Sequence, residues 1–388
     1  MNKITITDNI KYIGVDDKDI DLFESQYIVP NGISYNSYLI KDEKNVVMDT
    51  VDKRKTNEWL KKLEEALEGE KVDYLVISHL EPDHSSNIAL LCAKYPDMKL
   101  IGNSKTFAFL PQFFDIPNLE QRKIVVKEND VISTGKHSLK FIMAPMVHWP
   151  EVMVTYEETN KILFSADGFG KFGTLDTDEE WACEARRYYF NIVGKYGIQV
   201  QALLKKASTI DIKMICPLHG PILKEDLAYY INKYDIWSKY EPEEDGVFIA
   251  YASIHGNTAE VAKKLVEILE NKGAKKVAIA DLARDDMAEC IEDAFKYGKV
   301  VLAASSYNAG VFPPMEQFLR LLKEKNYQNR KIAIIQNGTW APSAAKTMLE
   351  IISEMKSITL VEPQVTIKTT MKEDNIKELN ILAENILK

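Results

Sequence analysis

Histidine and carboxylate side chains are concentrated in one short segment, SHLEPDH at residues 78–84. Two imidazoles and two carboxylates lie within six residues there, and first-row metal ions bind these ligand types. In an extended segment alternate side chains share one side, so His79, Glu81 and Asp83 should converge on one point. A polar surface turn is the alternative, but the density of ligand types argues against it. The segment therefore predicts a metal site.

The neighbouring elements are expected to hold this segment at the end of a strand. The apolar run at residues 74–77 favours a buried strand, and Pro82 should bar a helix, so the ligands are expected on an irregular loop. Strand patterns occur around it at 33–40, 45–49, 99–101, 123–126 and 139–144, and helical patterns at 56–67 and 86–95. Strands with helices outside them are typical of a layered sandwich.

One loop cannot complete a metal site, and three further candidates lie later in the first half of the chain. His148, Asp167 and His219 each end an apolar run and precede a loop that contains Gly or Pro. Sites are usually built on such loops. Each residue alone could equally be a buried side chain with ordinary hydrogen bonds. Together with residues 79–84, the three favour metal binding.

Composition and charge are typical of a globular protein with two domains. The chain has 388 residues, of which 46% are hydrophobic and 28% charged, and its net charge is −9. This charge argues against a nucleic-acid partner, which needs clustered Lys and Arg. We see no export signal and no apolar run of membrane-spanning length, so a cytoplasmic protein is expected.

The pattern changes after the acidic segment 241–246, which contains a proline and is predicted to be a linker. Beyond it, strand patterns at 247–252, 276–280, 300–304, 331–336 and 357–361 alternate with helical stretches. This alternation predicts a doubly wound α/β domain with a parallel sheet. We therefore expect domains at residues 1–245 and 246–388.

Three loops of the second domain follow strands and should meet at one edge of its sheet. The first, SIHGNT at 253–258, precedes a helix, where hydroxyl and backbone N–H groups favour an anion. It has neither a Walker lysine nor GxGxxG, which disfavours a nucleoside triphosphate or a Rossmann dinucleotide, and an ordinary helix cap is the alternative. The loops at 306–310 and 337–341 carry aromatic side chains that can stack on a planar ring.

The metal pattern resembles the metallo-β-lactamase domain of the flavodiiron proteins, or A-type flavoproteins, and the resemblance covers essentially the whole chain. It implies an α/β chain with an N-terminal αβ/βα metallo-β-lactamase-like sandwich, followed by a doubly wound parallel-sheet flavodoxin-like domain. Hydrolases of the same fold usually have His where this chain has Glu81. A carboxylate there suits a harder ion such as Fe(III), whereas imidazole suits Zn(II).

The resemblance also implies a pair of non-haem irons bridged by a carboxylate. The implied ligands are His79, Glu81 and His148 for one iron, Asp83 and His219 for the other, and Asp167 as the bridge. His84 matches the family pattern, but it is not dependably a ligand in the family. We expect it outside the ligand set, in contact with the ligands.

The loops of the second domain resemble the FMN site of flavodoxin. The resemblance implies that the first loop holds the FMN phosphate, that the other two hold the isoalloxazine, and that Trp340 stacks on it. His255 stands where Thr is usual, and its role is left open. The implied FMN-binding residues are Ser253, Ile254, His255, Gly256, Asn257, Thr258, Ser306, Tyr307, Asn308, Ala309, Gly310, Asn337, Gly338, Thr339, Trp340 and Ala341.

The resemblance implies an oxidoreductase in which an external donor reduces FMN and FMN reduces the irons, where O2 is reduced to water, NO to N2O, or both. Rubredoxin is the family's usual donor, and a separate donor is expected here. A head-to-tail homodimer, or a dimer of such dimers, would bring the FMN of one chain to the irons of another. The alternatives are a zinc-dependent hydrolase and an electron-transfer flavoprotein with an inactive metal domain.

Overall fold

The computed structural model describes residue 4 and residues 6–388, and the chain divides into two compact units. The first unit ends at Tyr189 and also takes in Ile198–Tyr234, while the second contains Phe190–Gly197 and Asp235–Lys388. The predicted domain boundary between residues 245 and 246 stays a prediction, and residues 1–3 and 5 of the predicted first domain lie outside the described residues. Within the described part of the chain, no helix is long and apolar enough to cross a membrane.

Two sheets form the centre of the first unit. The first has the strand order β1 (Ile10–Tyr12), β6 (Tyr38–Ile40), β7 (Val46–Met48), β8 (Tyr74–Val76), β9 (Lys99–Gly102) and β10 (Lys123–Val125). The second has the order β11 (Val131–Ser133), β12 (Ser138–Met143), β13 (Met153–Glu157), β14 (Ile162–Phe164) and β15 (Met214–Cys216). Two short pairs accompany them, β2 (Val15–Asp17) with β5 (Ile33–Tyr35), and β3 (Leu22–Phe23) with β4 (Tyr27–Ile28).

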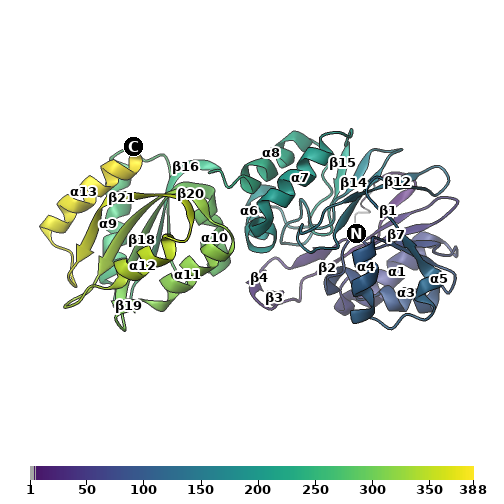
Figure 1. The fold of residues 1–388 in the computed structure, drawn as a ribbon, viewed down its shortest axis with the longest axis horizontal. Coiled ribbons are helices and arrows are strands. Elements are labelled where there is room, and N and C mark those ends of the chain that lie inside the picture. The colour runs from purple at the N-terminus through teal and green to yellow at the C-terminus, as the bar shows by residue number, and fades with distance from the viewer. Residues whose placement is uncertain (1–3, 5) are drawn as a thin grey trace. The chain divides into compact units, whose positions relative to one another are not determined.

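Apolar side chains from both sheets share one buried core, which includes Met48 and Val76 from the first sheet and Phe141 and Phe164 from the second. The helices lie outside the strands, as Figure 1 shows. They are α1 (Thr56–Leu67), α2 (Pro82–Ser85), α3 (Ile88–Lys94), α4 (Ser104–Phe109), α5 (Leu119–Arg122), α6 (Trp181–Tyr188), α7 (Gly197–Ala207) and α8 (Leu227–Ser238). The predicted layered sandwich is therefore present.

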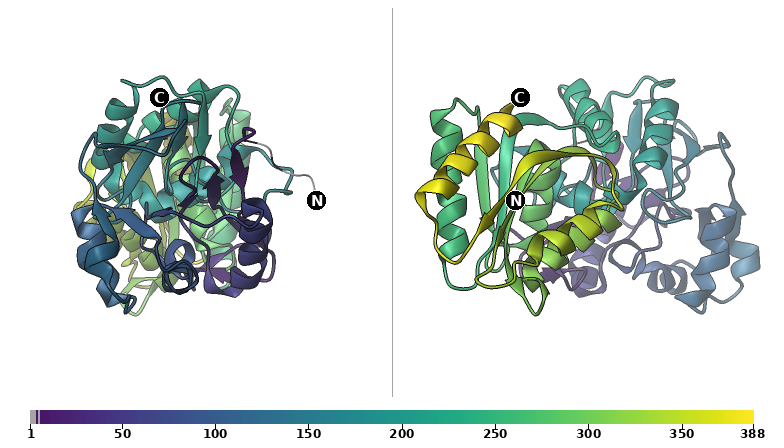
Figure 2. Two further views of the ribbon diagram at one scale, coloured as in Figure 1. Left: turned by 90° about the vertical axis from the view of Figure 1, so that its right-hand side faces the viewer. Right: turned by 60° about the vertical axis from the view of Figure 1, so that its left-hand side comes forward.

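The second unit has a parallel sheet in the order β17-β16-β18-β20-β21. The strands are β16 (Glu244–Ala252), β17 (Val277–Asp281), β18 (Tyr297–Tyr307), β20 (Gln328–Asn337) and β21 (Lys356–Ile367), and β19 (Gly310–Val311) pairs with β18. Helices α9 (Asn257–Asn271) and α13 (Glu373–Leu387) cover one face, and α10 (Met287–Lys296), α11 (Pro313–Glu324) and α12 (Ala344–Ile352) the other, as Figures 1 and 2 show. The predicted doubly wound domain is confirmed.

Two details of the predicted elements are wrong. The strand expected at 33–40 is divided into β5 and β6. The chain leaves the strand at Asn36, whose side-chain amide donates hydrogen bonds to the carbonyls of Pro217 and Gly220. The linker expected at 241–246 is strand from Glu244 onward, because acidic residues at a strand's start can pair with lysines of its neighbours. Lys276 lies 2.7 Å from Glu244 in this way.

Candidate metal centre and cofactor loops

Strand ends bring the predicted ligands together in the first unit. His79 and Glu81 follow β8, His148 lies in the connection from β12 to β13, and Asp167 and His219 follow the parallel strands β14 and β15. His79 and His219 are fully buried, and Asp167 is 1% exposed. Residues from distant parts of the sequence therefore share one interior space.

The segment after β8 is not the irregular loop that we expected, because Pro82 begins the short helix α2. Proline is favoured at a first helical position, where its missing N–H would have no intrahelical partner anyway. The expectation that Pro82 bars a helix is therefore wrong. Neighbouring side chains in a helix are about 100° apart, so Asp83 and His84 can face the same space.

The first group of ligand atoms consists of His79, Glu81, His148 and Asp167. Glu81 Oε2 lies 3.2 Å from His79 Nε2 and 3.1 Å from His148 Nε2. Asp167 Oδ2 lies 3.4 Å and 3.3 Å from the same two nitrogens. Two imidazoles and two carboxylates thus surround one position.

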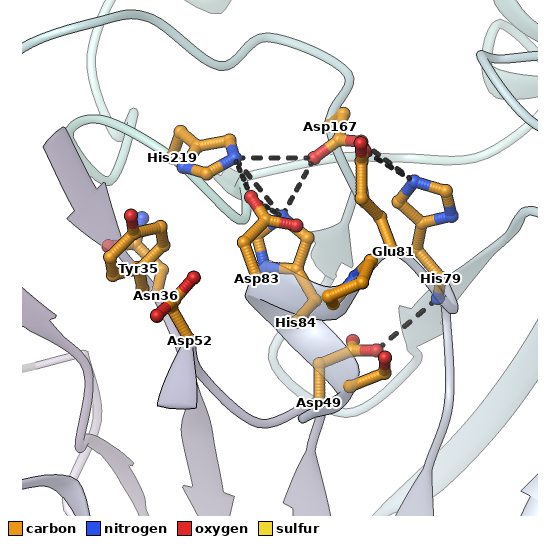
Figure 3. Close-up of polar contacts among 12 residues, drawn as sticks. Tyr35, Asn36, Asp49, Asp52, His79, Glu81, Asp83, His84, Asp167 and His219 are labelled. Carbon is orange, nitrogen blue, oxygen red and sulfur yellow. Dashed lines mark hydrogen bonds and ion pairs between the residues drawn. The ribbon is translucent and has the colours of Figure 1, made fainter. Parts of the chain in front are cut away.

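The second group contains Asp83, His84 and His219. Asp83 Oδ2 lies 3.2 Å from Nε2 of both His84 and His219. Asp167 Oδ1 lies 3.2 Å from His84 Nε2 and 3.8 Å from His219 Nε2, and Figure 3 shows Asp167 between His79 and His219. Asp167 therefore turns one oxygen toward each group, as a bridging carboxylate must.

His84 lies inside the second group, although we expected it outside the ligand set. Its Nε2 lies 3.1 Å from His219 Nε2, and each of these two nitrogens lies 3.2 Å from Asp83 Oδ2. Its Nδ1 is buried and has no hydrogen-bond partner. The exclusion of His84 from the ligands stays a prediction, but the helical turn of α2 gives it the orientation of a ligand.

Carboxylate oxygens without hydrogen bonds indicate that the cluster fits cations. Both oxygens of Asp83 and both oxygens of Asp167 are buried and accept no hydrogen bond from the described residues. Burial of carboxylates without positive partners is costly. Imidazole nitrogens and carboxylate oxygens are also the usual ligands of first-row metals. The residues present therefore fit two metal ions.

Imidazolium–carboxylate pairs balance charge in the metal-free cluster. Burial lowers the pKa of His148, but the nearby carboxylates of Asp167 and Glu81 outweigh this and raise the pKa to about 9. Burial raises the pKa of Asp167, but His148 and His84 hold it well below its usual range. A metal ion must displace the protons of these imidazoles before it can bind.

Several residues that orient the ligands were missed in the sequence. Glu151 Oε1 lies 2.8 Å from His79 Nδ1, and the carbonyl of Ser34 lies 2.7 Å from His219 Nδ1. Asp49 Oδ1 accepts the backbone N–H of Ser78 at 2.7 Å. Asp49 directly follows an apolar strand, so the signal that pointed to Asp167 could have found it. Glu151 carries no local signal.

The three predicted cofactor segments lie at one edge of the second unit's sheet, because they lie at the carboxyl ends of the neighbouring parallel strands β16, β18 and β20. Residues 306–310 are not a separate loop but the turn between β18 and β19, where Tyr307 pairs with Gly310. Residues 253–258 lead into α9, and Gly256 caps that helix with a φ of 95°. Nothing lies within 4 Å of the place where its side chain would be. The first N–H groups of a helix have no intrahelical partner, so this loop offers donors to an anion.

Exposed aromatic rings accompany those donors in the other two loops. Trp340 is 91% exposed and Tyr307 45% exposed. The hydroxyl of Ser306 accepts the backbone N–H of Ser343, and the side-chain amide of Asn337 bonds to both backbone groups of Thr369. Ser306 and Asn337 thus fix the loops, and open rings beside anion donors fit a planar cofactor with a phosphate. The individual FMN contacts stay predictions.

Family comparisons match both halves of the chain. A family described as ODP family beta lactamase matches residues 33–220, and the flavodoxin family matches residues 249–379. An uncharacterized protein of Methanocaldococcus jannaschii is 28% identical over 383 residues, which are 97% of this chain and 95% of that protein. The anaerobic nitric oxide reductase flavorubredoxin of Aeromonas hydrophila is 28% identical over 88% of this chain and 71% of its own length.

Solved structures are similar over the whole chain. Rubredoxin oxygen:oxidoreductase from Desulfovibrio gigas has a TM-score of 0.90 and 25% identity, covering 100% of this chain and 98% of that one. A variant of the flavo di-iron protein from Thermotoga maritima has a TM-score of 0.89 and 28% identity, covering 100% and 99%. Both the fold and the order of the two domains are therefore shared with these proteins.

Metal binding is predicted to release protons and to tighten as pH rises. The pKa of His148 is raised to about 9 in the metal-free protein, against about 6.5 for an unfolded histidine. A raised folded-state pKa stabilises the metal-free protein below about pH 6.5, and this stabilisation is lost as pH rises through about 9. Metal ions need the neutral imidazole, so their affinity should increase across the same window.

Proton release on addition of Fe(II) or Zn(II), followed with a pH indicator, measures this effect directly. Thermal unfolding of the metal-free protein across the window is the companion measurement, with the metal-loaded protein as control. Metal uptake without proton release, together with a metal-free stability that does not fall with pH, would contradict the prediction.

Proposed function

This chain has the two domains and the fold of the flavodiiron proteins, and from that premise we propose that it reduces O2 to water, NO to N2O, or both. The family resemblance predicted from the sequence is confirmed, and the protein is an oxidoreductase. In the proposed reaction, electrons come from a separate donor and pass through FMN to two irons. The proposal includes both oxidants because one similar protein is named a nitric oxide reductase and another an oxygen:oxidoreductase.

The position of Glu81 is the observation that carries the proposal. Its Oε2 lies 3.2 Å from His79 Nε2 and 3.1 Å from His148 Nε2. A zinc hydrolase would have a third imidazole at this position in place of the carboxylate. An anionic oxygen at this place favours a harder ion of higher charge. Glu81 therefore supports iron over zinc and a redox reaction over hydrolysis.

The residues of the cluster would divide the work of holding two irons. We assign His79, Glu81 and His148 to one ion and Asp83 and His219 to the other, with Asp167 between them and His84 beside the second. Irons bound in this way supply one-electron steps and open positions for a small oxidant, and a bound flavin supplies the electrons.

Aromatic rings shield the ligand side chains from water. The ring of Phe23 lies 5.4 Å from that of His219, and the ring of Trp149 lies 5.1 Å from that of His79 at an angle of 90°. Such apolar surroundings lower the local dielectric and strengthen the attraction between carboxylates and cations. These contacts orient the imidazoles while adding no competing ligand.

The FMN would be held by the three loops at the sheet edge. Residues 253–258 would take the phosphate at the start of α9, and Trp340 would stack on the isoalloxazine. Rubredoxin or another separate protein is the proposed donor, which the names flavorubredoxin and rubredoxin oxygen:oxidoreductase of similar proteins support. The homodimer or dimer of dimers and the cytoplasmic location stay predictions.

Anaerobic turnover tests the proposed function. Protein loaded with FMN and iron, and supplied with reduced rubredoxin, should consume O2 or NO added in turn, measured by electrodes for both gases. Zinc-loaded protein with FMN is the control, because it keeps both sites filled but cannot change the charge of its metals. Iron-loaded protein that is no faster than this control with either gas would refute the proposal.

Replacing Glu81→His should convert the first metal position toward a zinc site. We expect the preference for iron over zinc to fall by at least about tenfold, the scale of loss known even for residues that do not touch the metal. Turnover should be lost while the fold is kept. Metal analysis after growth with both metals measures the change, with Glu120→His, at an exposed position, as control. Two bound irons and normal turnover in the variant would show that this carboxylate is not needed.

Replacing Trp340→Ala should weaken FMN binding by about 1 kcal/mol or more, because a large exposed ring can no longer stack on the flavin. Titration of flavin fluorescence measures the affinity, and the iron content should be unchanged. Trp340→Phe, which keeps a ring, is the control and should lose less. If the FMN affinity of Trp340→Ala equals that of the wild type, a different residue stacks on the flavin, and Tyr307 is the next candidate.

A further inference from the structure

We propose that Glu151 makes the two metal positions unequal, because it fixes and polarises His79 and so favours Fe(III) at the position of His79, Glu81 and His148. This inference rests on the proposed function in so far as the metals are iron. It assigns a positioning role to a residue outside the ligand set. Glu151 is fully buried, so its charge is not screened by water.

The geometry around Glu151 leaves His79 one orientation. Glu151 Oε1 lies 2.8 Å from His79 Nδ1 and accepts the backbone N–H of Leu80 at 3.0 Å. With Nδ1 bound to a carboxylate, the proton of a neutral imidazole stays at Nδ1 and the lone pair is at Nε2. That nitrogen faces Glu81 and Asp167. Glu151 therefore selects the tautomer that can bind a metal.

The loop that carries Glu151 also carries a ligand of the same group. His148 lies three positions earlier, and Trp149 between them packs its ring at 90° to that of His79. The backbone carbonyl of Glu151 accepts a hydrogen bond of 2.6 Å from the side chain of Asn103, which fixes this loop to the start of α4. One short loop thus supplies a ligand and orients another.

The second group lacks such a carboxylate behind its imidazoles. His219 Nδ1 faces the neutral carbonyl of Ser34 at 2.7 Å, and His84 Nδ1 has no hydrogen-bond partner. Among these three histidines, only His79 is bound to a buried anion through its second nitrogen. A carboxylate draws the Nδ1–H proton toward itself and makes Nε2 a stronger electron donor, whereas a carbonyl does so less.

Each position has one carboxylate of its own, Glu81 at the first and Asp83 at the second, so the polarised nitrogen of His79 is the effect that distinguishes them. Stronger donors stabilise the higher-charged ion, so the first position should be oxidised before the second. The change is a one-electron oxidation from Fe(II) to Fe(III), with the electron going to the oxidant. No proton moves, because His79 keeps its proton at Nδ1.

The variant Glu151→Gln isolates the charge, since glutamine keeps the size and an oxygen that can accept both N–H groups. Iron-loaded wild type and variant are titrated with a redox mediator, and the ferric fraction of each iron is followed by Mössbauer spectroscopy. We expect the Fe(III)/Fe(II) ratio of the first-oxidised iron, at a fixed potential, to fall about tenfold in the variant. For one electron this equals a rise in potential of about 59 mV.

Glu157→Gln is a matched control elsewhere in the same unit. Glu157 is also fully buried and lies 3.0 Å from a histidine, His137 Nδ1, but neither residue belongs to the two ligand groups. This control should leave both iron potentials unchanged. A Glu151→Gln protein with two irons and wild-type potentials would overturn the proposal, as would an equal shift in Glu157→Gln.

If Glu151→Gln binds too little iron for the titration, Co(II) binding to the same variant decides the question. A loss of about tenfold in affinity at one site, with the other site unchanged, supports the proposal, and an equal loss at both sites overturns it. The redox titration uses no O2 or NO. A wild type that fails to reduce either gas would therefore refute the proposed function without deciding the role of Glu151.

Discussion

The attraction between buried carboxylates and cations is the interaction on which the first unit depends. Glu81, Asp83 and Asp167 meet within one interior space, and the oxygens of both aspartates lack hydrogen bonds. Such a cluster is stable only with positive charge among the oxygens. Protonated histidines supply it in the metal-free protein, and metal ions replace those protons when they bind. The residues that balance this buried charge are thus the same ones to which the proposed chemistry is assigned.

The fold brings these residues together at the cost of backbone strain near the ligands. Ala166, Phe169, Met146 and Asp49 have positive φ values between 50° and 65°, and none of them is glycine. Such conformations cost on the order of 1 kcal/mol each and persist where the surroundings over-determine them. Ala166 directly precedes Asp167, so the strain is concentrated in the turn that presents the bridging carboxylate.

Local sequence signals were sufficient for much of the fold and for the proposed ligands. His148, Asp167 and His219 are predicted because each ends an apolar run. The parallel sheet of the second unit is predicted from the alternation of strands and helices. The role of Glu151 could not be predicted, since it lies 72 positions from His79 and carries no local pattern. The orientation of His84 also differs from the prediction, because Pro82 begins a helix here and does not break one.

We propose that Asp167 lies between two irons in the first unit. X-ray diffraction from iron-loaded crystals, collected on both sides of the iron absorption edge, locates the metals directly. We expect two iron peaks, one beside His79, Glu81 and His148 and the other beside Asp83 and His219. A single peak, or zinc at both positions after loading with equal amounts of the two metals, would contradict it.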